Sequence, residues 1–222
     1  MDSNTTAVLF DIDGTLVDST YHHALAWHRA FTPLGDAPAL WRIHRSIGMG
    51  GDKLVAHVAG QEVEDRHGDA LRDSWRQEYV KIRSEVRPLR GAANLVRHLS
   101  DSGVRIAVAS SGDPEFAKEA VDLLGIGDRI EVLTTSRDVD GSKPEPDLIG
   151  VTLDRMGGIE RAVFVGDTPY DVEAADRAGL GCIALLTGGF SSAELVEAGA
   201  SMVAESAADL IGVDWPFYLS RR

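Results

Sequence analysis

The sequence predicts an α/β fold: a doubly wound parallel sheet with a small all-helical domain inserted after the first strand. Short apolar runs that barely alternate recur along the chain, which is typical of parallel strands buried on both faces. Amphipathic segments of helical period lie between most of these runs, and roughly a hundred residues separate the first run from the second. That gap is too long for a simple crossover, so we expect an additional helical unit within it.

The expected strands are five runs rich in valine, isoleucine and leucine. Turn residues bound each run, and the lengths suit strands of a parallel sheet. They cover residues 7–10, 105–110, 130–135, 161–166 and 182–187.

The segment PEFAKEAVDLLG, residues 114–125, shows how the expected helices are recognised. Pro114 is placed to open the helix and Gly125 to close it. The segments 91–102, 145–156 and 169–178 have the same character. The apolar positions of the first segment recur at helical spacing: Phe116, Ala120, Val121 and Leu124.

Residues 19–86 are expected to form a helical cap domain, with residues 1–18 and 87–222 as the catalytic core. The cap segment has helical periodicity and no comparable strand signal. Its tryptophans, Trp27, Trp41 and Trp75, are expected in the core of the cap. The ending DWPFYLSRR either packs back on the core or contacts another subunit, and the oligomeric state stays open.

Composition narrows the classes of function. The chain has 222 residues, a net charge of −13 and no cluster of lysine and arginine, so we expect no nucleic-acid partner. No stretch approaches the ~18 apolar residues of a membrane span, and the N-terminal segment does not resemble a signal peptide. Cys182 is the only cysteine, in an apolar run, which favours a cytoplasmic protein with a buried thiol.

Two aspartates follow the first expected strand directly, in the stretch FDIDGTLVDS. Ligands of open parallel sheets bind beyond the carboxyl ends of the strands, so Asp11 and Asp13 are expected to face that crevice. Gly14 permits the tight turn that follows them.

Polar residues follow the other expected strands as well. Ser110 and Ser111 end the second, Lys143 lies in the loop after the third, and Asp167 and Asp171 follow the fourth. If these ends converge, several carboxylates share one crevice, and two carboxylates ~4 Å apart repel by roughly 4 kcal/mol at an effective dielectric of about 20. One lysine cannot offset several such pairs, so the cluster predicts a Mg²⁺ ion as cofactor.

This combination favours phosphoryl transfer. A carboxylate can attack phosphorus and form an aspartyl-phosphate, which divides one difficult step into two. A cation and a lysine stabilise the negative charge spread over the phosphoryl group. A second carboxyl group can donate a proton to the leaving oxygen and then accept one from water.

The motifs closely resemble those of the haloacid dehalogenase-like hydrolase superfamily. DIDGT matches its first motif, the serine that ends AVAS its second, the lysine of SKPEP its third and GDTPYD its fourth, in this order along the chain. The helical insertion resembles the cap of the subgroup that contains phosphoglycolate phosphatase and β-phosphoglucomutase. The fold implied is a Rossmann-like core.

The resemblance implies a role for each matching residue. Asp11 would be the nucleophile and a metal ligand. Asp13 would be the general acid and base, with its backbone carbonyl on the metal. Ser110 would bind the phosphoryl group. Ser111 competes with Ser110 for this role, or contributes its backbone N–H instead. Lys143 would bridge nucleophile and phosphate. Asp167 would bind Mg²⁺ directly, and Asp171 would act through water or by orienting the site. Thr15 would support the loop between core and cap.

Other residues have a weaker signal. Relatives that cleave phosphonates use a cap lysine, so Lys53 is a candidate for substrate binding. With Asp13 present, we expect a specificity role or an exposed position for it. The glycine-rich stretch 47–54 fits either a loop over the active site or a plain connecting turn. The three histidines near the start of the cap are expected to pack or to face solvent rather than bind metal: His22, His23 and His28.

Three functions remain in competition. The leading one is a Mg²⁺-dependent phosphatase that hydrolyses a small phosphate monoester beneath a mobile cap. The alternative is a sugar-phosphate mutase of the β-phosphoglucomutase type, which would use the same residues and return the phosphoryl group to the substrate. A phosphoacceptor signalling domain also places aspartates and a lysine around Mg²⁺, but such domains are smaller and lack a large insertion.

Overall fold

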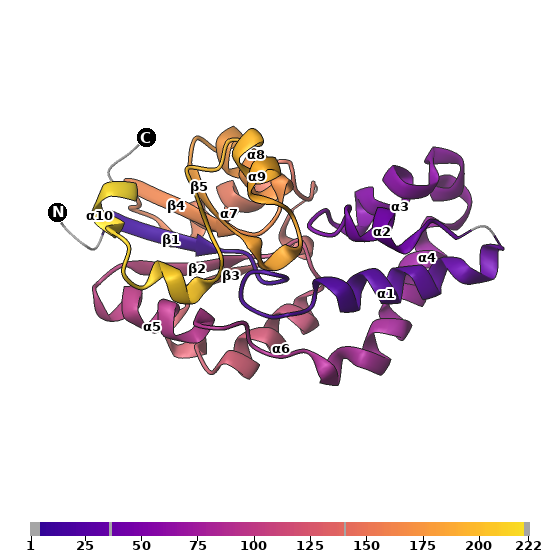
Figure 1. Ribbon diagram of the computed structural model, residues 1–222, viewed down its shortest axis with the longest axis horizontal. Helices are drawn as coiled ribbons and strands as arrows, with labels where there is room; N and C mark the ends of the chain where they lie inside the picture. Colours follow the sequence, from indigo (N-terminus) through magenta and orange to yellow (C-terminus); the bar gives the residue numbers. More distant parts are fainter. Residues whose placement is uncertain (1–4, 36, 140, 220–222) are drawn as a thin grey trace.

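The structure contains a six-stranded parallel sheet in the order β3-β2-β1-β4-β5-β6. The computed structural model describes residues 5–35, 37–139 and 141–219. The sheet confirms the predicted fold class, and Figure 1 shows it flanked by helices. Its strands are β1 (Thr6–Phe10), β2 (Arg105–Ala109), β3 (Val132–Thr134), β4 (Arg161–Gly166), β5 (Gly181–Leu185) and β6 (Met202–Ala204).

The central strand β1 explains why the apolar runs do not alternate. All five of its residues are buried. Val8 and Phe10 pack into the hydrophobic cluster on one face of the sheet, and Ala7 and Leu9 into the cluster on the other. Both faces are covered, so both sets of alternating side chains must be apolar.

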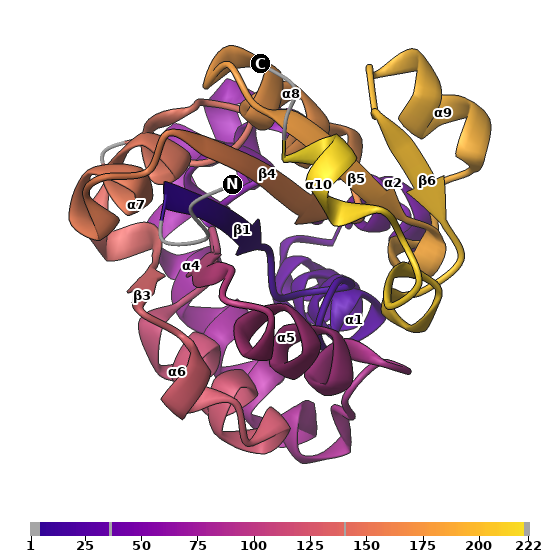
Figure 2. The same ribbon diagram turned by 90° about the vertical axis from the view of Figure 1, so that its left-hand side faces the viewer.

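Helices form a layer on each face of this sheet (Figure 2). The first face is covered by α5 (Ala92–Asp101), α6 (Pro114–Leu124) and α10 (Trp215–Tyr218), and the second by α7 (Asp147–Met156), α8 (Pro169–Arg177) and α9 (Ser192–Glu197). The ends of α6 follow the sequence signals. Pro114 occupies its first turn, Asp113 accepts a hydrogen bond from the backbone N–H of Glu115, and Gly125 is left-handed at its C-terminus.

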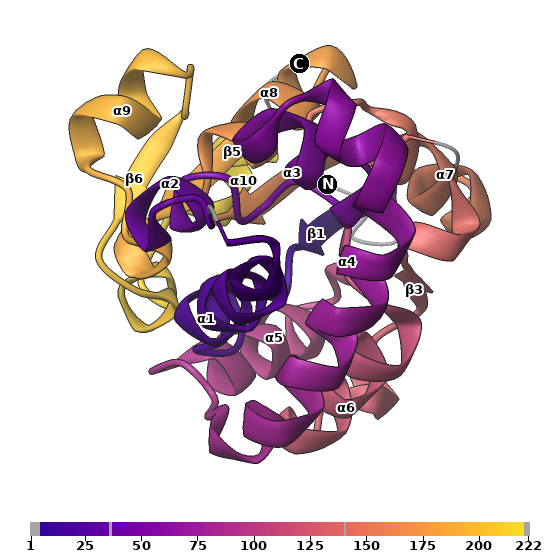
Figure 3. The same cartoon turned by 90° about the vertical axis from the view of Figure 1, so that its right-hand side faces the viewer.

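Four further helices lie beyond the carboxyl ends of the strands, where the arrow of β1 points in Figure 1 and nearest the viewer in Figure 3. They are α1 (Thr20–Phe31), α2 (Leu40–His44), α3 (Gly51–Ala59) and α4 (Gln61–Ile82). They enclose a hydrophobic cluster of their own that includes Trp27 and Leu54, with Trp75 packed against it. The expectation for Trp41 is wrong: its side chain is 70% exposed, because short α2 turns it away from this cluster.

The C-terminal part of the chain departs most from the sequence interpretation. Strand β6, three residues long at the edge of the sheet, is too short to give a recognisable pattern. The described part of the tail, up to Leu219, packs back on the core, since Trp215 and Leu219 are buried and the indole N–H of Trp215 donates to the carbonyl of Leu210 at 3.0 Å. Residues 220–222 lie outside the described residues. No helix in the described ranges is both long and apolar enough to cross a membrane.

We predict that Trp215→Ala lowers the free energy of unfolding by about 3–5 kcal/mol, because it empties a buried position and removes the hydrogen bond from the indole N–H to the Leu210 carbonyl. Urea denaturation followed by circular dichroism measures this change. Phe217→Ala in the same helix is the matched control. Its ring is 44% exposed, so a loss below about 1 kcal/mol is expected. Equal losses for the two variants would contradict the packing role of Trp215.

Candidate active site

The turn after β1 presents Asp11 and Asp13 at the carboxyl edge of the sheet. The backbone N–H of Asp11 donates to the Val165 carbonyl of β4 at 2.9 Å, so the chain continues the strand geometry up to this residue. Gly14 then adopts a φ of 81°, where a Cβ atom would lie 2.3 Å from Oδ2 of Asp167. Glycine is required there because the turn passes so close to that carboxylate.

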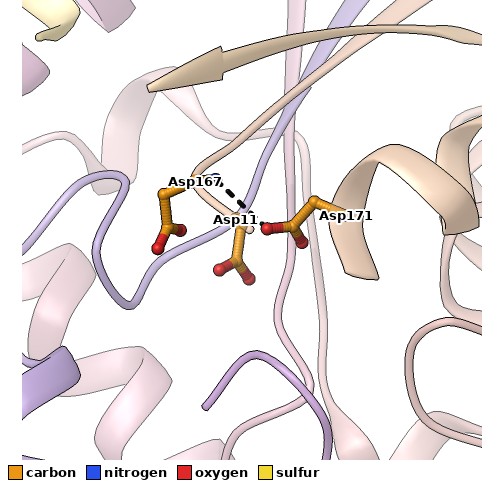
Figure 4. Close-up of side chains that lie close together, drawn as sticks. All are labelled: Asp11, Asp167 and Asp171. Atoms are coloured by element: carbon orange, nitrogen blue, oxygen red, sulfur yellow. Dashed lines mark hydrogen bonds between the residues drawn. The ribbon is translucent and has the colours of Figure 1, made fainter. Parts of the chain in front are cut away.

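Three buried carboxylates from two strand ends and a helix meet at this edge. Single oxygen atoms of Asp11, Asp167 and Asp171 all lie within 4.8 Å of one another. Figure 4 shows the three carboxylates facing a common region, Asp11 and Asp167 from the ends of β1 and β4 and Asp171 from the first turn of α8. The predicted convergence of these strand ends is therefore present.

Lys143 lies between two of these acids. Its ammonium is 2.5 Å from Oδ1 of Asp11 and 2.8 Å from Oδ1 of Asp171, and its side chain is buried. The loop that follows β3 carries this lysine to the site, and its backbone N–H donates to Oγ of Ser111 at 3.4 Å. Lys143 therefore contacts three of the predicted site residues, Asp11, Ser111 and Asp171.

Asp171 is fixed by the first turn of α8. Its Oδ2 atom accepts hydrogen bonds from the backbone N–H groups of Asp167 (3.1 Å, drawn in Figure 4) and Thr168 (3.0 Å) and from the Thr168 hydroxyl (2.8 Å). These bonds form a capping box with Thr168. One oxygen of Asp171 is therefore committed to the helix, and the other faces Lys143.

Burial and mutual repulsion change how these groups ionise. Burial, with repulsion from Asp171 and Asp13, raises the pKa of Asp11 to about 7, although Lys143 opposes the shift. Burial, followed by the charges of Asp171 and Asp11, also raises the pKa of Asp167. The pKa of Lys143 is raised because the attraction of Asp11 and Asp171 outweighs its burial.

Asp167 carries the observation that best fits a metal ion. Its Oδ1 accepts from the Thr15 hydroxyl at 2.7 Å, but its buried Oδ2 has no hydrogen-bond partner within the described part of the chain. A Cβ atom on Gly188 would lie only 1.9 Å from that oxygen. An orphaned buried carboxylate oxygen beside Asp11 suits a hard divalent cation such as Mg²⁺, which takes oxygen ligands.

Asp13 stands apart from these three acids and is held by the helical insertion. Its Oδ1 accepts from the hydroxyl of Ser19 at 2.5 Å and lies 3.0 Å from Nε2 of His23 on α1. Burial would raise the pKa of Asp13, but His23 and Ser19 outweigh it and hold the pKa below its ordinary value. The sequence interpretation missed this contact, and the ten-residue spacing to a helix that begins directly after the motif is the signal that would have found it.

The serines of the second motif take different positions. Ser110 is buried, and its hydroxyl accepts from the backbone N–H of Gly112 at 3.1 Å. Ser111 and Gly112 line the cavity above the acids. The structure therefore brings both serines to the site, with Ser111 nearer the open space.

Lys53 lies at the boundary between insertion and core. Its ammonium donates to the Ser142 carbonyl at 2.7 Å and to Glu145 at 3.4 Å, whereas its neighbours Gly51 and Asp52 line the cavity. Since this ammonium is already bonded to the loop that carries Lys143, the structure places Lys53 as a tie between the two parts rather than facing the cavity.

A cavity of about 390 Å³ separates the acids from the helical insertion. Asp11, Asp13 and Ser111 line its core side, and α1, α4 and the stretch 47–52 line the other. The volume falls in the range of sites for small organic ligands. The glycine-rich stretch is thus both the start of α3 and a wall of this cavity.

The family follows from comparison with known proteins. Residues 8–185 match the model of the haloacid dehalogenase-like hydrolase family. The chain belongs to this family.

Individual relatives agree with this assignment. The chain is 29% identical over 183 residues to a phosphoglycolate phosphatase of Aquifex aeolicus, covering 78% of this chain and 80% of the relative. It is 30% identical over 219 residues to validoxylamine A 7'-phosphate phosphatase of Streptomyces hygroscopicus subsp. limoneus, covering 94% and 95%. The crystal structure of a hydrolase from Pseudomonas syringae superposes with a TM-score of 0.87 at 32% identity, covering 93% of this chain and 96% of that one.

We predict that Mg²⁺ stabilises the protein and that its removal makes stability depend on pH. The folded pKa of Asp11, about 7, lies above its ordinary value of 3.8. The folded state therefore holds a proton that the unfolded state releases, and stability present below pH ~4 is lost as the pH rises through about 7. With EDTA, the Tm measured by calorimetry should fall between pH 5 and pH 8, and Mg²⁺ at a hundred times its Kd should add about 2.7 kcal/mol at pH 8.

Asp167→Asn is the variant that tests the metal assignment. It removes the unpartnered charge, so its Tm in EDTA at pH 8 should exceed that of the wild type, and Mg²⁺ should no longer raise it. A full response of this variant to Mg²⁺ would contradict the assignment of Asp167 as a ligand.

Proposed function

We propose that this protein is a Mg²⁺-dependent phosphatase that hydrolyses a small phosphate monoester through an aspartyl-phosphate on Asp11. The observation that carries the proposal is the buried cluster of Asp11, Lys143 and Asp167 at the open end of a parallel sheet, facing a cavity of ligand size. The phosphoglycolate phosphatase and the validoxylamine A 7'-phosphate phosphatase to which the chain is similar support a phosphate ester as substrate. The two relatives are named for different esters.

We further propose that residues 19–86 form a cap domain and that residues 1–18 and 87–222 form the core. The separate hydrophobic cluster of α1–α4 supports this division. The two segments that connect the core to the insertion also support it. They run side by side, because the backbone N–H of Asp18 donates to the Arg87 carbonyl at 2.8 Å. A paired hinge of this kind suits a cap that opens and closes over the cavity.

In the first step, a carboxylate oxygen of Asp11 attacks phosphorus, and the bond from phosphorus to the leaving oxygen breaks. Lys143 orients the attacking carboxylate and offsets its charge. Ser110 and the backbone N–H of Ser111 would hydrogen-bond the phosphoryl oxygens. Asp11, the carbonyl of Asp13 and Asp167 would hold the Mg²⁺, which when bound offsets the negative charge of the phosphoryl group.

Asp13 would act as general acid and then as general base. Because His23 and Ser19 hold the pKa of Asp13 below its ordinary value, its carboxylate would take up a proton when the phosphate dianion binds beside it, and in the first step it would give that proton to the leaving oxygen. In the second it accepts a proton from the water that attacks phosphorus, which breaks the acyl phosphate bond and restores Asp11. The role suits a carboxyl group that lines the cavity beside Asp11 and is oriented by two side chains of its own. Asp171 would orient Lys143 rather than bind the metal directly.

A mutase would use the same residues but must bind a second phosphoryl group on the cap side. The stretch 47–52, which lines the cavity there, contributes no cation to the lining. The cap arginines that line it, Arg72 and Arg76, are paired with acids of the protein. The phosphatase is therefore the better supported of the two functions.

We predict that Asp11→Asn abolishes phosphate release from p-nitrophenyl phosphate in the presence of Mg²⁺, because the amide oxygen is a poor nucleophile. Asp13→Asn should slow release by about 10²–10⁴-fold, the usual contribution of a general acid or base. Both rates come from a colorimetric assay of inorganic phosphate, with EDTA as the metal-free control.

Asp18→Asn is the matched variant for these two, since it makes the same change at an exposed side chain of the same segment. It should keep the wild-type rate. Unchanged release by Asp11→Asn would refute the aspartyl-phosphate mechanism.

We predict that His23→Phe lowers kcat by roughly tenfold, the cost of one hydrogen bond to a charged group, with little change in KM. Phenylalanine preserves the stacking of this position on Tyr79, whose ring centroid is 4.0 Å away, and removes only the contact with Asp13. Steady-state kinetics measures both constants. His28→Phe on the same helix, outside the cavity lining, should leave them unchanged; an equal effect of both variants would point to helix packing instead.

A further inference from the structure

Ser142 directly precedes the buried lysine of the site and is bonded to the helical insertion through its hydroxyl and its backbone. The hydroxyl oxygen accepts a hydrogen bond from the backbone N–H of Gly50 at 3.1 Å. The carbonyl accepts from the ammonium of Lys53 at 2.7 Å, and the backbone N–H donates to Oδ2 of Asp52 at 3.4 Å. The first turn of α3 and the glycine before it therefore contact all three polar groups of one core residue.

The insertion and the core also pack tightly at this point. Gly50 has an extended backbone, with a φ of −72° and a ψ of 161°, which other residues can adopt as well. A Cβ atom there would nevertheless lie only 2.5 Å from Cβ of Ser142, so the space requires glycine. Ser142 itself is 5% exposed. The contact is thus shielded from water, which strengthens its hydrogen bonds.

The core holds the same loop by longer contacts. The backbone N–H of Lys143 donates to Oγ of Ser111 at 3.4 Å. The carbonyl of Pro144 accepts from Arg177 of α8 at 3.2 Å, at an exposed position. The bond from Lys53 is shorter, 2.7 Å, and partly buried. The shortest of these bonds to the loop therefore comes from the insertion.

The ammonium of Lys143 depends on where this loop lies. It is 2.5 Å from Oδ1 of Asp11 and 2.8 Å from Oδ1 of Asp171, at the end of a flexible four-carbon stem. Misplacement of a catalytic group by about 1 Å can cost ~10²-fold in rate. A loop that shifts would move this ammonium relative to the carboxylate it orients.

We propose that Ser142 is a positioning residue for Lys143, held in place by the bonds from Gly50 and Lys53 of the insertion. The inference rests on the proposed phosphatase function, in which Lys143 orients the attacking carboxylate. Lys53 then acts through Ser142 rather than on the substrate. The insertion consequently has a task besides covering the cavity, because Lys143 keeps its working position only while α3 rests against the loop that carries it.

Two variants, assayed on p-nitrophenyl phosphate with Mg²⁺, test this role. Lys53→Met removes the donor to the Ser142 carbonyl, and Ser142→Ala removes the acceptor of the Gly50 N–H. Each should lower kcat roughly three- to tenfold, the cost of one hydrogen bond. KM should change little, because a misplaced lysine weakens stabilisation of the transition state rather than binding of the ester. Lys53→Arg keeps a charged donor and should retain most of the wild-type kcat.

Arg45→Met is the matched control for loosening the insertion in general. Arg45 also ties the insertion to the core, through an ion pair with Glu194 of α9, away from the loop of Lys143. Its kcat should stay within about twofold of the wild type. Equal losses in Arg45→Met and Lys53→Met would show that only the overall seating of the insertion matters, and would overturn the positioning role.

Binding of orthovanadate, a phosphate-like anion, shows whether the effect passes through Lys143. Calorimetric titration with Mg²⁺ gives the Kd for the wild type, Lys53→Met, Lys143→Met and the double variant. Lys53→Met should weaken binding roughly three- to tenfold in the wild type and add nothing once Lys143 is replaced, because residues that act through one another are not additive. A full additional loss in the double variant would overturn the inference.

Failure of the inference and failure of the proposed function give different results. No phosphate release by the wild type from p-nitrophenyl phosphate would overturn the phosphatase and the positioning role together. Wild-type release with an unchanged kcat in both Lys53→Met and Ser142→Ala would overturn the positioning role alone and leave the phosphatase standing.

Discussion

The buried ammonium of Lys143, held between Asp11 and Asp171, is the contact on which the rest of the site depends. Three carboxylates share this low-dielectric region, and one lysine balances two of them at short range. Asp167 keeps an oxygen without a partner in the described chain. The metal-free protein therefore holds an uncompensated charge or a proton at this edge, and a divalent cation would relieve both the repulsion and the desolvation.

The order of the strands makes this arrangement possible. Strand β1 lies between β2 and β4, with Phe10 opposite Val108 and Val165 in parallel register. The chain segments that leave these three strands consequently start at the same level. The first turn of α8 then holds Asp171 through three hydrogen bonds, so the acids are fixed by backbone structure rather than by flexible side chains.

The helical insertion completes the site instead of merely covering it. Helix α1 supplies His23, which orients Asp13, and α4 supplies Trp75 and the paired arginines of the far wall. Charged contacts tie the insertion to the core at separate points, with Arg45 bonded to Glu194 and Arg76 to Asp113. Movement of the insertion would break these contacts and displace His23 from Asp13, so the orientation of the Asp13 carboxylate depends on where the insertion lies.

The sequence by itself determined the sheet, the order of the motifs and the acids that meet at its edge, because burial on both faces and turn residues leave local patterns. It did not reveal edge strand β6, the exposure of Trp41 or the position of Lys53, which depend on contacts between distant segments. Only the tertiary structure decided that His23 contacts Asp13 and that Arg76 pairs with Asp113. Both facts depend on where the insertion rests against the core, and no local pattern encodes that distance.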